Sequence, residues 1–274
     1  MHIKFYKYSG SGNDFIVIDN REKILKGKKV FTFTKKVCDR KNGIGGDGVL
    51  LLENSKKYDF KMRIINADGS EAEMCGNGAR CISHFAYHLK IVNKNMKFET
   101  KAGLITGEIK KNGIKVKLTQ PYDFKDNIKL KYKNKEYTLY FLNTGVPHLV
   151  IFVNNIETID VKNIGAFFRY HKKFQPAGTN VNFVKVIDKH NILIRTYERG
   201  VEDETLACGT GSTAGAIISS IIKKCESPVK VKTRGGEILK IYFTIKKENK
   251  LINIEEAYLE GKVVQIFKGE LISL

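Results

Sequence analysis

Apolar residues recur along this chain at two different spacings, and each spacing predicts a different element. Two long segments repeat them at the spacing of an α-helix. The apolar positions of these segments are Ile82, Phe85, Ala86 and Leu89 in the first, and Ala214, Ile217, Ile218 and Ile221 in the second. We expect the second helix near 209–224, and shorter helices near 31–40 and 160–169.

Strands are expected where short apolar or alternating runs are bounded by glycine, proline or asparagine. These runs are 2–8, 15–19, 49–52, 58–66, 96–100, 103–110, 113–119, 128–134, 136–143, 148–153, 181–187 and 191–198, with further strands toward the C-terminus. Many short strands combined with two long helices predict an α+β fold. In this fold, each long helix would be wrapped by a curved β-sheet or barrel.

Each long helix is preceded by a cysteine and two spaced glycines. The first motif is Cys75-Gly76-Asn77-Gly78, and the second is Cys208-Gly209-Thr210-Gly211. A cysteine at a helix N-terminus lies beside unpaired backbone N–H groups and the positive end of the helix dipole, which favours the thiolate and binds anions. We therefore expect two reactive thiols that face one anionic substrate.

The two motifs belong to a longer internal repeat. Cys75 and Cys208 are 133 residues apart, and other matching landmarks, such as Gly10 with Gly145, are separated by 132 to 135 residues. Such a period is too long for a solenoid and indicates two pseudo-symmetric duplicated domains. The polar stretch from Gln120 to Asp123 marks the expected boundary. We predict an N-terminal domain over 1–120, completed by 264–274, and a C-terminal domain over 121–263.

Composition agrees with a globular protein of this size. The chain has 274 residues, of which 42% are hydrophobic, so each half can bury a core. No apolar run approaches the roughly 20 residues needed to span a bilayer. The N-terminus resembles a charged strand rather than a signal peptide, and the five cysteines are an odd number. We expect a cytoplasmic protein with free thiols.

The formal net charge of +19 comes mostly from lysines scattered through turns. A nucleic-acid-binding protein would be expected to concentrate arginines or interleave its basic residues with aromatic ones. We interpret the excess as a solvated surface whose field attracts small anionic substrates. The alternative is a lysine-rich protein that binds nucleic acid or anionic metabolites, with structural cysteines. This alternative predicts salt-sensitive binding that survives loss of both thiols.

The cysteine pattern narrows the possible chemistry. Zinc sites use ligands paired at short spacing, a pattern that these cysteines lack, so no metal is expected. Cys38, Cys81 and Cys225 are interpreted as small buried apolar residues. The six histidines mostly lie outside any motif, whereas a cysteine nucleophile usually needs a histidine base. Two equivalent thiols instead suit racemisation or epimerisation, in which one base removes a proton from one face and the other returns it to the opposite face.

Several motifs taken together resemble the diaminopimelate epimerase family over the whole chain. They are the segments 8–15, 66–70, 74–80, 147–148, 178–180, 197–200 and 207–211. The resemblance implies a cofactor-independent isomerase that interconverts LL- and meso-diaminopimelate for lysine and peptidoglycan synthesis. It also implies two barrel-like domains, each around a central helix, with the site in the cleft between them. We expect a homodimer that binds neither nucleic acid nor membrane.

The resemblance also implies roles for individual residues. Cys75 and Cys208 would be the two catalytic bases, supported by His148 near the cleft and by Glu198. The backbone N–H groups at Gly76-Asn77 and Gly209-Thr210 would hold the α-carboxylate. The remaining substrate-binding side chains would be Asn66 and Glu198 at the α-ammonium group, and Asn13, Asn180 and Arg199 at the distal amino-acid end. Gly48 and Val146 depart from the family pattern, because some members carry a side-chain amide toward substrate at these positions.

An alternative within the same class is a racemase or epimerase for another amino acid, such as a relative of proline racemase. A small apolar substrate would not need the polar set Asn13, Asn180 and Arg199. A second charged amino-acid end must be matched by buried polar partners. Comparing turnover of LL-diaminopimelate, proline and hydroxyproline would separate these alternatives.

Overall fold

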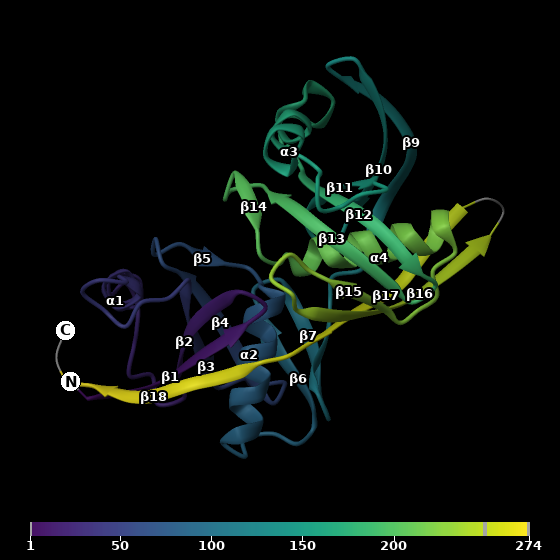
Figure 1. Cartoon of the computed structure of the whole chain (residues 1–274). Helices are drawn as coiled ribbons and strands as arrows, with labels where there is room; N and C mark the ends of the chain where they lie inside the picture. Colours follow the sequence, from purple (N-terminus) through teal and green to yellow (C-terminus); the bar gives the residue numbers. More distant parts are fainter. Residues whose placement is uncertain (1, 249–250, 273–274) are drawn as a thin grey trace. The chain divides into compact units, whose positions relative to one another are not determined.

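The computed structural model describes residues 2–248 and 251–272, which form two compact units (Figure 1). The first unit comprises Met1–Val116 and Gly261–Leu274, and the second comprises Lys117–Glu260. Each unit contains one long helix that lies against its own strands. The two units share the same order of strands and helices.

The first unit is a mixed sheet with one helix on each face. Its strands are β1 (Ile3–Gly10), β2 (Asn13–Asp19), β3 (Gly48–Glu53), β4 (Phe60–Asn66), β5 (Glu71–Ala72), β6 (Asn95–Thr100), β7 (Gly103–Lys110), β8 (Gly113–Lys117) and β18 (Val264–Leu271). They pair in the order β18–β1–β2–β3–β4–β6–β7–β8, with β5 also on β4. The helices α1 (Lys29–Cys38) and α2 (Gly76–His88) connect the two parallel pairs, β2–β3 and β4–β6, because parallel neighbours need a crossover.

The second unit repeats this order. Its strands are β9 (Tyr122–Tyr132), β10 (Lys135–Asn143), β11 (Pro147–Phe152), β12 (Asn180–Asp188), β13 (Asn191–Glu198), β14 (Asp203–Thr205), β15 (Val229–Lys232), β16 (Ile238–Glu248) and β17 (Leu251–Gly261). They pair as β9–β10–β11–β12–β13–β15–β16–β17, with β14 on β13. The helices α3 (Val161–Tyr170) and α4 (Gly209–Lys223) make the crossovers, and the short η1 (Lys172–Phe174) follows α3. The C-terminal β18 pairs with β1 as β9 pairs with β10.

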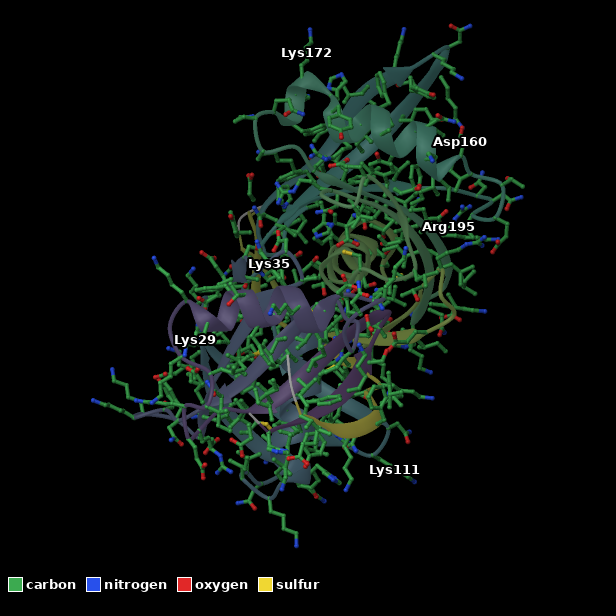
Figure 2. All side chains as sticks on the ribbon, turned by 90° about the vertical axis from the view of Figure 1, so that its left-hand side faces the viewer. Lys29, Lys35, Lys111, Asp160, Lys172 and Arg195 are labelled. Atoms are coloured by element: carbon green, nitrogen blue, oxygen red, sulfur yellow. The ribbon has the colours of Figure 1, made fainter. Side chains whose placement is uncertain are left out.

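The two faces of each sheet pack on different helices, so the central strands are apolar on both sides. In β3 the side chains of Val49 and Leu51 pack in a cluster with α1, whereas Leu50 faces Gly78 of α2. This double burial explains the unbroken apolar run from Val49 to Leu52, which is typical of strands covered on both faces. Helix α4 is buried along most of its length, and Figure 2 shows this green helix nearly end-on with strands curving around it.

Most of the elements predicted from hydrophobic spacing are confirmed. The two long helices correspond to α2 and α4, and 31–40 and 160–169 correspond to α1 and α3. Two expectations need correction. The short strands β5 and β14 were not predicted, because two or three residues carry no periodic pattern. Strand β9, expected near 128–134, begins already at Tyr122, because its residues are largely exposed and show no apolar pattern.

The surface and the cysteines also follow expectation. Lys29, Lys111 and Lys172 are exposed and project outward in Figure 2. Cys38, Cys81 and Cys225 are buried, and burial raises the pKa of Cys38 to about 11. Within the described residues, no helix has both the length and the apolar character required to cross a membrane.

Candidate active site

A cysteine caps the N-terminus of the central helix in each unit. Cys75 has extended backbone angles (φ −142°, ψ 122°), and its Sγ accepts a hydrogen bond of 3.4 Å from the backbone N–H of Gly78. Cys208 has nearly the same angles (φ −131°, ψ 113°), and its Sγ accepts from Gly211 at 3.4 Å. In both helices, sulfur therefore occupies the place of the serine or aspartate oxygen that usually caps a helix.

The second glycine of each motif packs closely against the neighbouring strands. A Cβ on Gly78 would lie 3.1 Å from Leu50 Cδ2, and a Cβ on Gly211 would lie only 2.4 Å from Asn182 Oδ1. At Gly211 a larger residue would push the first turn of α4, and the cysteine attached to it, away from the sheet. At Gly78 the neighbouring side chains would have to give by only a few tenths of an ångström.

The two thiols differ in their exposure to water. Cys75 is half-buried, whereas Cys208 is only 8% exposed. Burial raises the pKa of Cys208 to about 12, with a further contribution from the charge of Glu198, while hydrogen bonds from Thr210 and the backbone act in the opposite direction. At Cys208 burial therefore outweighs the preference for the thiolate that a helix N-terminus gives. The loss of hydration disfavours the anion more than the helix end stabilises it.

The charge of Glu198 acts on Cys208, and the pKa of Glu198 is itself shifted. It ends β13, and its Oε2 accepts a hydrogen bond of 2.9 Å from Thr205 Oγ1. Burial raises the pKa of this carboxyl, and the hydrogen bond from Thr205 offsets part of the effect. Because the charge of Glu198 raises the cost of ionising Cys208, an ionised Glu198 favours the neutral thiol.

His148 is fully buried in β11 and is held neutral. Burial, together with the positive charge of Arg199, lowers its pKa to about 3. Its Nδ1 lies 3.1 Å from Nδ2 of Asn182 in the parallel neighbour β12. His148 therefore contributes a neutral ring, rather than a cation, at physiological pH.

A chain of buried and half-buried polar side chains supports the first turn of α2 in the first unit. Asn77 Nδ2 donates to Asn13 Oδ1 at 2.7 Å, and Asn13 Nδ2 donates to Asp47 Oδ2 at 2.9 Å. The guanidinium of Arg80, which is fully buried, donates to Asn77 Oδ1 at 2.8 Å and also to Ser11. The structure thus brings together the predicted Asn13 and Asn77, which are 64 residues apart in sequence.

The second unit gathers the other predicted polar residues near the ends of β12 and β13. Asn180 Nδ2 donates to the carbonyl of Pro147, and Asn180 Oδ1 accepts from the backbone N–H of Arg199, both at 2.9 Å. The Arg199 guanidinium donates to the carbonyl of Ala177 at 2.7 Å. Thr144 at the end of β10 ties this region to α4 by donating to the carbonyl of Thr210 at 3.2 Å.

Asn66 ends β4, opposite Gly48 of β3, and its side chain donates to Ser70 Oγ at 3.0 Å. Gly48 has no room for a side chain, because an added Cβ would lie 2.6 Å from the carbonyl oxygen of Ile65. An amide at position 48 would therefore require the strands to move. Val146, which precedes β11, is half-buried, and its side chain carries no amide.

Several polar residues of these networks were given no role from the sequence, among them Asp47, Arg80 and Asn182. Asn182 carried a usable signal, since it interrupts an otherwise apolar strand, and a buried amide must find partners. Asp47 carried none, because its partner Asn13 lies 34 residues away. The bond from Arg80 to Asn77 spans a single helical turn, but the burial of the Arg80 side chain depends on the folded chain. Among the described residues, no cluster of three or more histidine, cysteine, aspartate or glutamate side chains has the geometry to hold a metal ion.

Comparison with solved structures shows the fold. A phenazine biosynthesis protein of the PhzF family from Bacillus anthracis is 18% identical, with a TM-score of 0.76 and full coverage of both chains. A hydroxyproline epimerase from Agrobacterium vitis is 11% identical, with a TM-score of 0.72 over 98% of this chain and 91% of the other. These likenesses confirm the predicted two-domain α+β fold.

Comparison of sequences shows the family. The family model described as diaminopimelate epimerase matches residues 5–122 and 140–265. The diaminopimelate epimerase of Aquifex aeolicus is 45% identical over 282 aligned positions, covering 98% of each chain. That of Hydrogenobaculum sp. is 43% identical over 97% of each chain. The matched ranges include both cysteine motifs, and the chain belongs to the diaminopimelate epimerase family.

Proposed function

We propose that this protein interconverts LL- and meso-diaminopimelate in lysine biosynthesis, with Cys75 and Cys208 as the two bases and without a cofactor. The observation that carries the proposal is the repeated cap, a cysteine sulfur at the N-terminus of each central helix with the same 3.4 Å contact to a backbone N–H. Two equivalent acid–base groups suit a reaction in which one group removes a proton from one face of the α-carbon and the other gives a proton to the opposite face.

The proposed reaction exchanges protons on opposite faces of one α-carbon. The thiolate of Cys75 removes the α-proton, and its electron pair remains on a planar carbanion conjugated with the carboxylate. The thiol of Cys208 then gives its proton to the opposite face, which leaves Cys75 as thiol and Cys208 as thiolate. The next turnover in the reverse direction starts from this second form.

The environment of Cys208 supports these starting roles. With a pKa raised to about 12 by burial, Cys208 is protonated in the free enzyme and can act first as the acid. The same burial makes its thiolate a stronger base when it forms, which helps removal of the weakly acidic α-proton in the reverse direction.

The substrate carboxylate next to the reacting carbon would be bound by backbone N–H groups. The first N–H groups of a helix have no acceptor within the helix, and they point along the positive end of its dipole. Gly76-Asn77 and Gly209-Thr210 are these positions in α2 and α4. Negative charge that develops on the carboxylate during proton removal would be stabilised by the same donors.

The remaining contacts are assigned by residue type. Asn66 and Glu198 would accept hydrogen bonds from the α-ammonium group. Asn13, Asn180 and Arg199 would bind the distal amino-acid end, because this end carries both an ammonium and a carboxylate group. His148 would support proton transfer as a neutral ring. We further propose that each of two domains contributes one base, and that the enzyme is a cytoplasmic homodimer.

A substrate comparison tests the proposal. Purified enzyme should convert LL-diaminopimelate to the meso isomer without added metal or cofactor, and it should leave proline and hydroxyproline unchanged. Chiral chromatography of each reaction measures the isomers directly. Preferential turnover of proline would overturn the substrate assignment, and activity that requires an added cofactor would overturn the proposed chemistry.

A further inference from the structure

Asn182 is a fully buried amide at the centre of a hydrogen-bond network in the second unit. Its Nδ2 donates to the carbonyl oxygen of Leu149 at 2.8 Å and lies 3.1 Å from Nδ1 of His148. Its Oδ1 accepts a hydrogen bond of 2.9 Å from Thr196 Oγ1. Both polar atoms of this amide therefore have hydrogen-bond neighbours, and one of these neighbours, the Leu149 carbonyl oxygen, can only accept.

The network allows only one orientation of the amide. A backbone carbonyl oxygen can accept but never donate, so the group that faces Leu149 must be the NH₂ of Asn182. Turning the amide over would place two acceptors, Oδ1 and the Leu149 oxygen, against each other. The hydroxyl of Thr196 fits the observed orientation by donating to Oδ1 at the opposite end.

This orientation determines which nitrogen of His148 carries its proton. Because the group beside Nδ1 is a donor, Nδ1 must be the acceptor with a free lone pair. The single proton of the neutral ring must then be on Nε2. Within the described part of the chain, His148 Nε2 is buried and has no hydrogen-bond partner. A buried donor without an acceptor costs about 1–3 kcal/mol, and such a group is often satisfied by a ligand.

We propose that Asn182 is a positioning residue that holds His148 in its Nε2–H form, so that His148 donates a hydrogen bond to a carboxylate of the substrate instead of acting as a base. This inference rests on the proposed function and defines the role of one of its residues. The nearby guanidinium of Arg199, whose charge acts on the same ring, favours an anionic group as the acceptor.

The position of the proton can be measured without turnover. In protein labelled with ¹⁵N-histidine, two-bond couplings between ring nitrogens and carbon-bound protons distinguish protonated from unprotonated nitrogens. The chain has six histidines, and the His148 signals are identified by their absence from a His148→Gln variant. We expect Nε2 protonated and Nδ1 unprotonated at pH 7.5. A proton on Nδ1 in the unsubstituted protein would overturn the proposal.

Two substitutions separate positioning from general support of the fold. In Asn182→Asp a carboxylate replaces the donor, so Nδ1 should become protonated, and turnover should fall by about 100-fold or more, because a wrong tautomer disables a positioned histidine. In Thr196→Val, the matched control, Leu149 still holds the amide nitrogen and the Nε2–H form should persist. An unchanged tautomer in folded Asn182→Asp protein would contradict the proposal.

Addition of LL-diaminopimelate tests the acceptor. The Nε2 resonance should shift as the substrate carboxylate binds, both in the unsubstituted enzyme and in a Cys75→Ala variant. A shift that disappears in Cys75→Ala would identify the thiolate as the acceptor and refute the carboxylate assignment. If the tautomer is as expected but LL-diaminopimelate is neither bound nor converted, the proposed function fails while the positioning role of Asn182 stands.

Discussion

The neutral, buried state of His148 should make the folded protein lose stability as the pH falls below 7. In the folded protein the pKa of His148 is lowered to about 3, whereas in an unfolded chain a histidine titrates near 6.5. Between these values the unfolded state binds one more proton than the folded state. Proton binding therefore favours unfolding, and the stability contributed by His148 is fully present above pH 6.5 and is lost as the pH falls toward 3.

The size of the effect follows from this difference. Each pH unit below 6.5 should remove about 1.4 kcal/mol, so the change from pH 7 to pH 5 is on the order of 2 kcal/mol. This window lies above the range in which most carboxylates titrate. Replacing His148 with glutamine removes the titrating ring, so the variant should be less stable at pH 7 but should lose about 2 kcal/mol less on going to pH 5.

Urea unfolding of both proteins at pH 7 and pH 5, at one ionic strength, measures the difference. His84 and His171 also have pKa values lowered by burial, but both are present in the two proteins and cancel in the comparison. His148 lies in the second unit, so the effect belongs to the transition of that unit if the units unfold separately. Equal pH dependence of the two proteins would refute a buried neutral His148.

Three further predictions concern the cysteines and the glycines that position them. Alkylation of Cys208 by iodoacetamide, followed by mass spectrometry, should continue to accelerate up to pH 10, and a plateau below pH 9 would contradict its raised pKa. Gly211→Ala should lower the free energy of unfolding by about 1–3 kcal/mol because the new Cβ would lie 2.4 Å from Asn182 Oδ1. In the same helix the new Cβ of Gly215→Ala would lie no closer than 3.2 Å to any side chain, so this variant should cost less in a urea titration. Mild oxidation should inactivate the enzyme reversibly by joining Cys75 to Cys208 if both thiols serve one substrate, and peptide mapping that finds a different linkage would count against this arrangement.

Hydrophobic spacing was sufficient to predict the secondary structure that forms the core. The run from Val49 to Leu52 and the helical pattern through Phe85 each reflect burial against neighbouring elements, because buried positions are occupied by apolar residues. Strand β9 shows no such apolar pattern, because its side chains are mostly exposed. The duplication supplied what local patterns could not, namely that the two cysteine motifs occupy equivalent positions.

The electrostatics of the candidate site could not be predicted in the same way. A helix N-terminus is visible in the sequence and favours the thiolate, but the burial that opposes this effect at Cys208 depends on the folded chain. The same is true of the network around Asn182, which joins three strands. Sequence motifs therefore indicated candidate residues, whereas their protonation depends on three-dimensional packing.

The most direct measurement is the rate of meso-diaminopimelate formation from LL-diaminopimelate by the Cys75→Ala and Cys208→Ala variants. Cys225→Ala is the matched control, because it removes a buried thiol that lies outside both motifs. Circular dichroism checks that each variant is folded. The account predicts that either alanine variant at a helix cap loses at least about 10³-fold in turnover, the scale expected for loss of a general acid or base, while Cys225→Ala remains active. Full activity in Cys75→Ala or in Cys208→Ala would contradict the two-base assignment.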